Sequence, residues 1–139
     1  MMKNVTWKVV CFLLALFVIA SCSSVSKSVT LDAKKAAILE NMLRSLDVPV
    51  TSIQSQGETV EVYYETSKAT AYDNQVVADW GTIFGAASEL KYETIRIHNT
   101  VNGVSYATLT AEGELVNAFA DGSINQSAFW ESVQITSNE

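Results

Sequence analysis

Cysteine, histidine and proline are scarce in this 139-residue sequence, which contains two cysteines, one histidine and one proline. A zinc site needs three or four His, Cys or carboxylate ligands, so one histidine with so few thiols argues against zinc. A nucleophilic triad needs a base beside its nucleophile, and no Gly-x-Ser-x-Gly motif accompanies His98. A lone strand histidine is more often a surface residue than a base. We therefore expect no enzyme, no cofactor and no metal site.

Basic side chains are also few. The chain carries 9 lysine and arginine residues against 15 aspartate and glutamate residues, a net charge of −6. Nucleic-acid binding requires a basic stripe or patch, and a polybasic patch strengthens attraction to anionic lipid. The sequence contains neither. We therefore expect no nucleic-acid partner, and the acidic balance is explained most simply as a contribution to solubility.

A long apolar run is missing as well, because the run from Val9 to Ala20 is short. A helix needs roughly 20 apolar residues to cross the hydrocarbon core of a bilayer. Lys3 and Lys8 precede this run, and the small residues Ala20 and Ser21 end it. A basic head, a short apolar core and a small-residue cleavage site are typical of a secretory signal peptide. An uncleaved transmembrane helix is the alternative, but these flanks favour cleavage.

Cys22 directly follows the expected cleavage site. The sequence Ile19-Ala20-Ser21-Cys22 resembles the lipobox of bacterial lipoproteins. This resemblance implies cleavage before Cys22, a diacylglycerol on its sulfur, and often a further fatty acid such as palmitate on the new amino terminus. Two or more acyl chains anchor a protein stably, so we expect a membrane-anchored protein of the cell envelope. In Gram-negative lipoproteins, a residue such as Ser23 rather than aspartate favours the outer membrane, facing the periplasm.

Three segments are expected along the chain: a signal peptide at residues 1–21, a lipidated, serine-rich tether at residues 22–30, and one globular domain at residues 31–139. Cleavage would remove two lysines and Cys11, which leaves a net charge of −8 and no thiol for a disulfide. The domain must then be stabilised by its core alone. The residues from Ser23 to Thr30 span at most about 26 Å when extended, which keeps the domain near the bilayer.

Hydrophobic periodicity predicts an α+β domain with the element order α-β-β-α-β-β-α-α. Apolar residues at three- and four-residue steps are typical of amphipathic helices, and alternation is typical of half-buried strands. We expect a small, mainly antiparallel sheet of two hairpins with helices packed on one face. The expected elements are helix 31–46, strands 50–55 and 58–66, helix 73–90, strands 93–101 and 104–111, and two short helices between Leu115 and Val133.

Single residues add finer expectations for the helices. Leu46 completes an apolar stripe that begins at Ala36 in the first helix. Gly81 and Gly85 each cost about 1 kcal/mol relative to alanine inside the long helix, so they indicate close approach of another backbone. Asn125 is expected to cap the last helix. Residues from Val133 to Thr136 are expected to be helical, with a short final strand as the alternative.

The hairpin turn at Asn102-Gly103 predicts a strand register. A two-residue loop pairs Val101 with Val104 and Ile97 with Thr108. In this register Leu109 points away from the helices. The side chains expected on the inner face are Ile95, Ile97, Val101, Val104 and Tyr106.

A candidate partner surface lies on the outer face of the predicted sheet. If strands 58–66 and 93–101 are neighbours, Glu61, Tyr63, Arg96 and His98 share this face with Leu109. Tyrosine and arginine are enriched at protein-binding hot spots. An ordinary solvated sheet face is the alternative, as is a face covered by another part of the chain.

Two functions from different classes are consistent with these features. The first is a non-enzymatic accessory or adaptor lipoprotein that contacts a protein partner at the membrane. The alternative is a periplasmic binding module for a small molecule or a cell-wall fragment, in a pocket lined by Trp80, Tyr106 and Trp130, residues whose usual role is core packing. A large exposed apolar patch would favour the adaptor, and a concave polar pocket of about 300 Å³ or more would favour the binding module.

Overall fold

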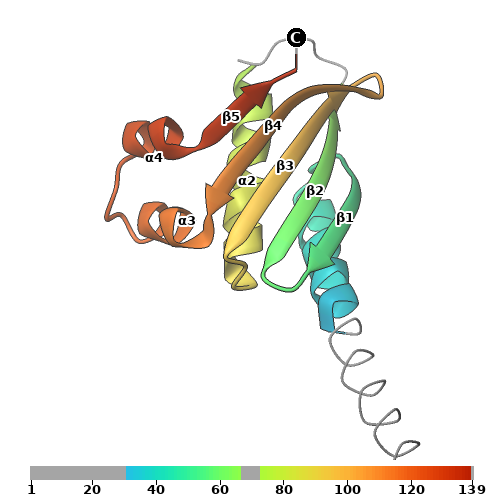
Figure 1. The fold of residues 1–139 in the computed structure, drawn as a ribbon, viewed down its shortest axis with the longest axis horizontal. Coiled ribbons are helices and arrows are strands. Elements are labelled where there is room, and N and C mark those ends of the chain that lie inside the picture. The colour runs from blue at the N-terminus through green and yellow to red at the C-terminus, as the bar shows by residue number, and fades with distance from the viewer. Residues whose placement is uncertain (1–30, 67–72, 139) are drawn as a thin grey trace, which may run out of the picture. The chain divides into compact units, whose positions relative to one another are not determined.

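Four segments with alternating apolar residues form strands, and a fifth strand lies near the carboxyl terminus of the chain. The computed structural model describes residues 31–66 and 73–138, so the predicted signal peptide, Cys22 and the tether lie outside the described residues. The strand order is β1-β2-β3-β4-β5, and helices accompany the sheet (Figure 1). The elements are a helix at residues 31–45, β1 (Val50–Gln56), β2 (Thr59–Thr66), α2 (Asn74–Glu89), β3 (Thr94–Val101), β4 (Val104–Glu112), α3 (Gly113–Ala120), α4 (Gln126–Ser132) and β5 (Gln134–Ser137).

The sheet is mixed, with a single parallel pair. β1 pairs with β2, β3 with β4, and β4 with β5 in antiparallel fashion, whereas β2 and β3 run parallel. A parallel pair needs a crossover connection, and α2 lies in the chain between these two strands. The predicted α+β class is therefore confirmed, and β5 extends the predicted order. β2 and β3 are neighbours, which is the condition on which the candidate partner surface depends.

The core lies between the sheet and the helices. β2 and β3 bury alternate residues, among them Val62 and Ile97, each with 0% exposure. The helix expected at residues 73–90 is confirmed as α2, and it buries an apolar stripe that includes Val76, Trp80 and Ile83. The first helix contributes its buried residues Leu39 and Leu43, whereas Leu46 is 57% exposed. Leu46 was expected to be buried, but the helix ends at residue 45 and Leu46 lies in the following turn.

One buried polar contact joins the sheet to α2. The Tyr64 hydroxyl donates a hydrogen bond of 2.7 Å to Oδ2 of Asp79, and Gln75 Nε2 donates to the other carboxylate oxygen at 2.9 Å. Burial and the hydrogen bond to Asp79 raise the pKa of the Tyr64 hydroxyl. The buried carboxylate is thus matched by donors from two different elements, as a buried charge requires.

The register predicted for the second hairpin is correct at its turn and wrong beyond it. Val101 pairs with Val104 as expected, but Ile97 pairs with Leu109, because the register shifts between Asn99 and Thr100. A β-bulge adds one residue to one strand and so reverses the faces of all later residues. Leu109 is consequently fully buried on the inner face rather than exposed on the outer one. Val104 was expected on the inner face and is 69% exposed beside the turn.

The close backbone approach expected at Gly81 and Gly85 is absent. A Cβ atom added at either position meets nothing within 4 Å. The approach occurs instead at Gly113, where an added Cβ would lie 2.1 Å from the backbone oxygen of Tyr92. The amide of Gly113 also donates a hydrogen bond of 2.8 Å to the carbonyl of Glu93. Only glycine therefore fits at the junction between β4 and α3.

The carboxyl-terminal segment folds back onto the sheet after two short helices. Asn125 caps α4 as expected, because its Oδ1 accepts a hydrogen bond of 2.9 Å from the amide of Ala128. Phe129 is buried against Phe84, with ring centroids 5.9 Å apart. Residues Gln134–Ser137 form β5. The expectation of helix there was wrong, and the alternative of a short final strand is correct.

Candidate functional site

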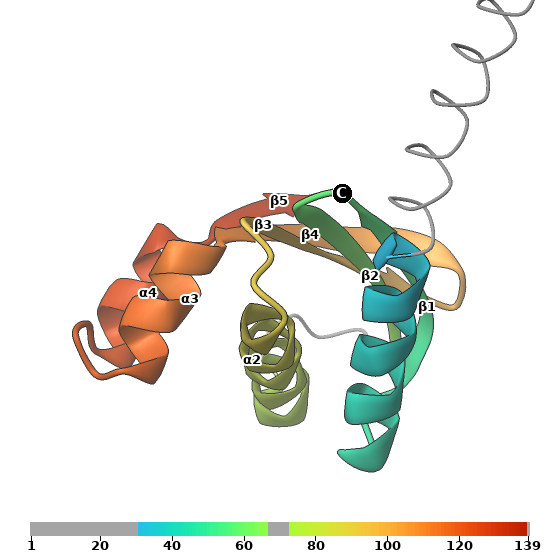
Figure 2. The same ribbon diagram turned by 90° about the horizontal axis from the view of Figure 1, so that it is seen from below.

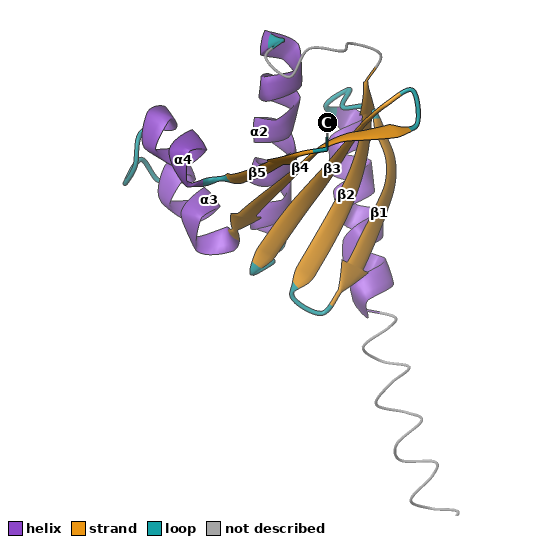
Figure 3. Ribbon diagram, turned by 45° about the horizontal axis from the view of Figure 1, so that its top comes forward, coloured by secondary structure: helices purple, strands orange, loops and turns teal. Residues whose placement is uncertain are grey.

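One face of the sheet is open, and the candidate surface lies on it. All helices of the described residues lie on the same side of the sheet, as Figure 2 shows from below. Figure 3 shows the same arrangement with the strands in orange and the helices in purple. Within residues 31–66 and 73–138, no element covers the opposite side, which we call the outer face. The first helix, one part of the chain that could have covered this face, lies on the other side of the sheet.

The four residues predicted for the partner surface come together on the outer face. The parallel register of β2 and β3 places Glu61 beside Arg96 and Tyr63 beside His98. Glu61 and Arg96 form an ion pair with Nη1 and Oε1 2.6 Å apart. The rings of Tyr63 and His98 stack with centroids 4.7 Å apart and an interplanar angle of 16°. We call these four residues the outer-face quartet.

Glu61 links Arg96 and His98 within the quartet. The Nε2 atom of His98 lies 3.5 Å from the Oε1 atom that Arg96 contacts. The hydrogen bond from Arg96 holds the pKa of Glu61 below its usual value, with partial burial opposing this effect and His98 adding to it. Glu61 is therefore ionised near neutral pH. A salt bridge this close to solvent contributes only about 0.2–1 kcal/mol to stability, so its geometry matters more than its energy.

Polar residues surround the quartet on every strand. Glu61 is paired with Gln54 of β1, and Arg96 with Thr110 of β4. Thr110 is in turn paired with Gln134 of β5, so one polar row crosses all five strands. A second row, also crossing all five, consists of Ser52, Tyr63, His98, Thr108 and Thr136.

Because Leu109 is buried, the outer face lacks the exposed apolar residue that was expected there. It presents hydroxyl, amide, guanidinium and carboxylate groups around one aromatic stack. Such a surface suits polar and aromatic contacts more than a large apolar partner.

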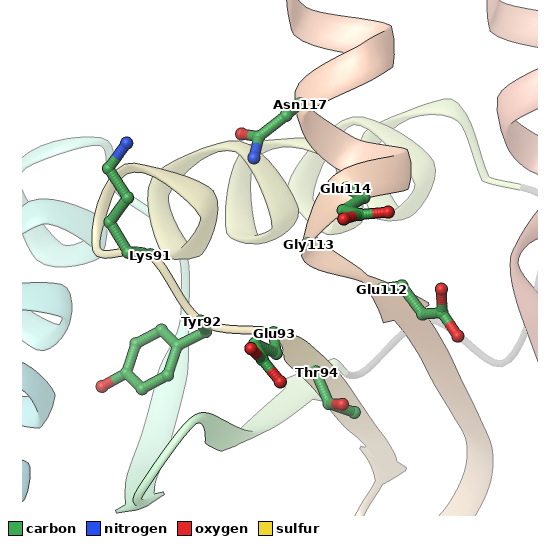
Figure 4. A pocket seen from close by; sticks show the side chains of 8 residues that line it. All are labelled: Lys91, Tyr92, Glu93, Thr94, Glu112, Gly113, Glu114 and Asn117. Carbon is green, nitrogen blue, oxygen red and sulfur yellow. The ribbon is translucent and has the colours of Figure 1, made fainter.

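A hollow lies at the end of the sheet where β3 begins and β4 ends. Its volume is about 540 Å³. In Figure 4, the side chains of Lys91 and Asn117 lie on one side of it, and the carboxylates of Glu93 and Glu112 lie on the other. The hydrogen bond that Glu93 shares with the Glu58 side chain is the main cause that raises the pKa of Glu93, and the charges of Glu58 and Glu114 act in the same direction. The full lining consists of Lys91, Tyr92, Glu93, Thr94, Glu112, Gly113, Glu114 and Asn117.

A second hollow of about 370 Å³ adjoins the first. It shares Thr94 and Glu112 with the first hollow and extends to Ser132 and Gln134, at the junction of α4 and β5. Gly113 lines the first hollow, and sequence reasoning missed its close contact with Tyr92. The available signal was a glycine placed between two glutamates, Glu112 and Glu114.

The aromatic residues expected to line a pocket belong to the core instead. Trp80 is 4% exposed and packs against Trp130, with ring centroids 6.5 Å apart. Tyr106 is half-buried in β4. None of these three residues lines either hollow.

Residues 31–66 and 73–138 contain neither a metal-binding cluster nor a membrane-spanning helix. No group of three or more His, Cys, Asp or Glu side chains there could hold a metal ion. No helix there is both long enough and apolar enough to cross a membrane.

The fold and the open face define a small α+β module whose mixed five-stranded sheet has helices on one side only. A family model described as "Domain of unknown function (DUF8159)" matches residues 31–139. The chain therefore belongs to this family. No curated protein and no solved structure matches it.

Proposed function

We propose that this protein is a lipid-anchored envelope lipoprotein that acts as a non-enzymatic adaptor through its outer face. Two independent observations support the proposal. The sequence that ends at Cys22 resembles a lipoprotein signal, and the domain that follows leaves one sheet face open. The tether between them is short, so a partner bound to the domain is held at the membrane.

The observation that carries the adaptor role is the preorganised outer-face quartet. Glu61 fixes the guanidinium of Arg96, and Tyr63 stacks on His98, so these side chains have little freedom left to lose on binding. Binding is stronger when contact residues are already ordered, because less conformational entropy is lost. Arginine and tyrosine are also the residues that most often dominate binding energy at protein interfaces. A protein partner with complementary polar and aromatic groups fits this arrangement.

The anchor is tested with Cys22→Ala. In cells fed a labelled fatty acid, the parent chain should incorporate label and sediment with membranes. The variant should lose the label and be released or remain unprocessed. Mass spectrometry of the parent protein should show a diacylated or triacylated cysteine as the first residue. An intact, unmodified amino terminus would contradict the anchor.

The adaptor role is tested by photo-crosslinking in intact cells. A photoreactive amino acid replaces Thr110, which pairs with Arg96 on the outer face. The same amino acid at Asn117, in the hollow, serves as the control position. A defined adduct should form from position 110 and should vanish when Tyr63→Ala and Arg96→Glu are introduced. An adduct that still forms in the doubly substituted protein would show that the partner does not bind through the outer face. An adduct that forms equally from position 117 would show the same.

A ligand-binding module remains a second candidate because the hollow of about 540 Å³ exceeds the minimum size expected for such a site. Its lining combines several carboxylates with Lys91 and Asn117, which suits a small ligand that carries amino and hydroxyl groups. The test is titration of soluble cell-wall fragments into the labelled protein, followed by NMR. Shifts confined to Lys91, Thr94 and Asn117 would support this candidate. Shifts confined to the outer-face quartet would instead support binding at the sheet.

A further inference from the structure

The first helix exposes apolar residues although it packs on the sheet. Six large apolar side chains are exposed in the described residues, and three of them belong to this helix or the turn that follows it. Leu31 is 55% exposed, Ile38 is 40% exposed and Leu46 is 57% exposed. Core packing does not explain the exposure of these three residues, because the helix contacts the core through Leu39 and Leu43.

Helix geometry places Leu31 and Ile38 on one side of the helix, and Leu46 lies in the turn that follows it. Positions seven apart differ by only about 20° around an α-helix, so Leu31, Ile38 and Ser45 form one line. Lys34 and Asn41, both exposed, lie beside this line. We call the exposed residues Leu31, Lys34, Ile38, Asn41, Ser45 and Leu46 the helix flank.

The flank carries one positive charge, on Lys34, in a domain that is strongly acidic overall, and the exposed Asp47 directly follows Leu46. The two carboxylates of this helix lie elsewhere and are engaged. Asp32 accepts a hydrogen bond of 3.2 Å from the amide of Gly57, and Glu40 pairs with Arg44 at 2.5 Å. An apolar line bordered by lysine is the arrangement that helices use when they lie on a membrane surface.

From these observations we infer that the helix flank docks on the surface of the bilayer, against anionic phospholipid headgroups. This inference rests on the proposed lipid anchor at Cys22. The eight residues from Ser23 to Thr30 cannot separate the domain from the anchored cysteine by more than about 26 Å, so the flank stays within reach of the bilayer. A lysine near an anionic surface is attracted to it, and buried apolar side chains add to this attraction.

Docking would also orient the module. The flank belongs to the helical layer, and the outer face lies on the other side of the sheet (Figure 2). The outer-face quartet would then point away from the bilayer, where a partner can reach it.

The test uses the full chain, expressed with its own signal so that it is processed and lipidated, and reconstituted into vesicles of phosphatidylethanolamine and phosphatidylglycerol. The mature chain has no free thiol when Cys22 is acylated, so one added cysteine can carry an environment-sensitive fluorophore. Ser45→Cys reports from the flank. Gln126→Cys, at the start of α4, is the matched control because it is also exposed.

The label at position 45 should shift its emission to shorter wavelength on vesicles and be protected from an aqueous quencher, while the label at position 126 should not change. Adding Ile38→Ser and Leu46→Ser should abolish the protection while the protein still floats with the vesicles. Lys34→Glu should reduce protection on anionic vesicles and leave it unchanged on neutral ones. All three parent residues are exposed, so circular dichroism should show an unchanged fold.

The possible failures can be distinguished. If the parent protein does not float, the lipid anchor is wrong, and the docking inference is lost with it. If the protein floats but the labels at positions 45 and 126 are quenched equally, the anchor stands and membrane docking is wrong. Protection in whole envelopes but not in pure vesicles would assign the flank to a protein partner and would also overturn the inference.

Discussion

The two faces of the sheet come from the same strands but have opposite chemistry. On the inner face, Val62, Ile97 and Leu109 are fully buried beneath the helices. Immediately beside them in the sequence, Glu61, Arg96 and Thr108 are directed to the open side. The comparison shows that burial of apolar side chains selects the residues of the inner face, whereas it does not select those of the outer face. Its fixed ion pair and ring stack are therefore the better candidates for function.

The inner face has polar exceptions of its own. The hydroxyl of Tyr64 has a hydrogen-bond partner in Asp79. Asn99, by contrast, is 1% exposed, and its side-chain amide has no hydrogen-bond partner among the residues that the structure describes. An unpaired buried amide costs stability, so the inner face is not packed for stability alone.

The largest expected contrast between the faces is at neighbouring residues of β4. Leu109→Ala should lower the free energy of unfolding by about 2–5 kcal/mol, because it removes a fully buried side chain and leaves a cavity. Thr108→Ala, on the outer face, should change it by less than about 0.5 kcal/mol. Urea unfolding of both variants measures the difference. Equal effects would contradict the bulge and restore the simple hairpin register.

The adjacent tyrosines of β2 provide a second contrast. Tyr64→Phe removes the hydroxyl that donates to the buried Asp79 and should cost about 1.5–3 kcal/mol, as for a hydrogen bond to a charged group. Tyr63→Phe keeps the ring that stacks on His98 and should cost less than about 0.5 kcal/mol. Thermal unfolding compares the two variants. A larger loss for Tyr63→Phe would reverse the assignment of the faces.

Two glycine substitutions test where the packing is tight. Gly113→Ala should destabilise the domain by about 1–3 kcal/mol, because its Cβ would overlap the backbone oxygen of Tyr92. Gly81→Ala, in the open side of α2, should stabilise it by up to about 1 kcal/mol through higher helix propensity. Chemical denaturation gives both values. Destabilisation by Gly81→Ala would show that another backbone does approach α2.

The smallest expected effect concerns the outer-face ion pair and pH. Because Arg96 holds the pKa of Glu61 below its usual value of 4.5, the pair stabilises the fold above that value. This contribution is lost as the pH falls through the lowered pKa, and at this exposure it is at most about 1 kcal/mol. Glu61→Gln should therefore reduce stability at neutral pH but not in strong acid. In Arg96→Gln, NMR titration should find the Glu61 pKa raised, and an unchanged pKa would contradict the pairing.

Much of the fold could be predicted because it depends on local periodicity. A few neighbouring residues are enough to indicate the buried stripe of α2, the alternation in β2 and the turn at Asn102-Gly103. That turn has its positive φ values, 52° at Asn102 and 78° at Gly103, as the sequence motif requires. The quartet could be predicted for the same reason, since alternation alone assigns its members to one face once β2 and β3 are neighbours.

The predictions from sequence were wrong where a feature depended on segments that are far apart in the chain. The bulge after Asn99 has no local signal, yet it reverses the side of Leu109. Gly113 is required because Tyr92, which precedes β3, passes next to it. Gly81 and Gly85 gave a false signal for the same physical reason, since the sequence reports which residue is small but not what lies beside it.

The sequence by itself determined the helices, the first four strands and the polar face, because periods of two and of three to four residues are properties of neighbouring residues. It also provides the basis for the proposed lipid anchor, which depends on a short contiguous motif. Only the tertiary structure decided the parallel pairing across α2, the reversed face of β4 and the hollow beside Gly113. These features depend on contacts between segments far apart in the chain, where packing selects one arrangement from several that the local pattern permits.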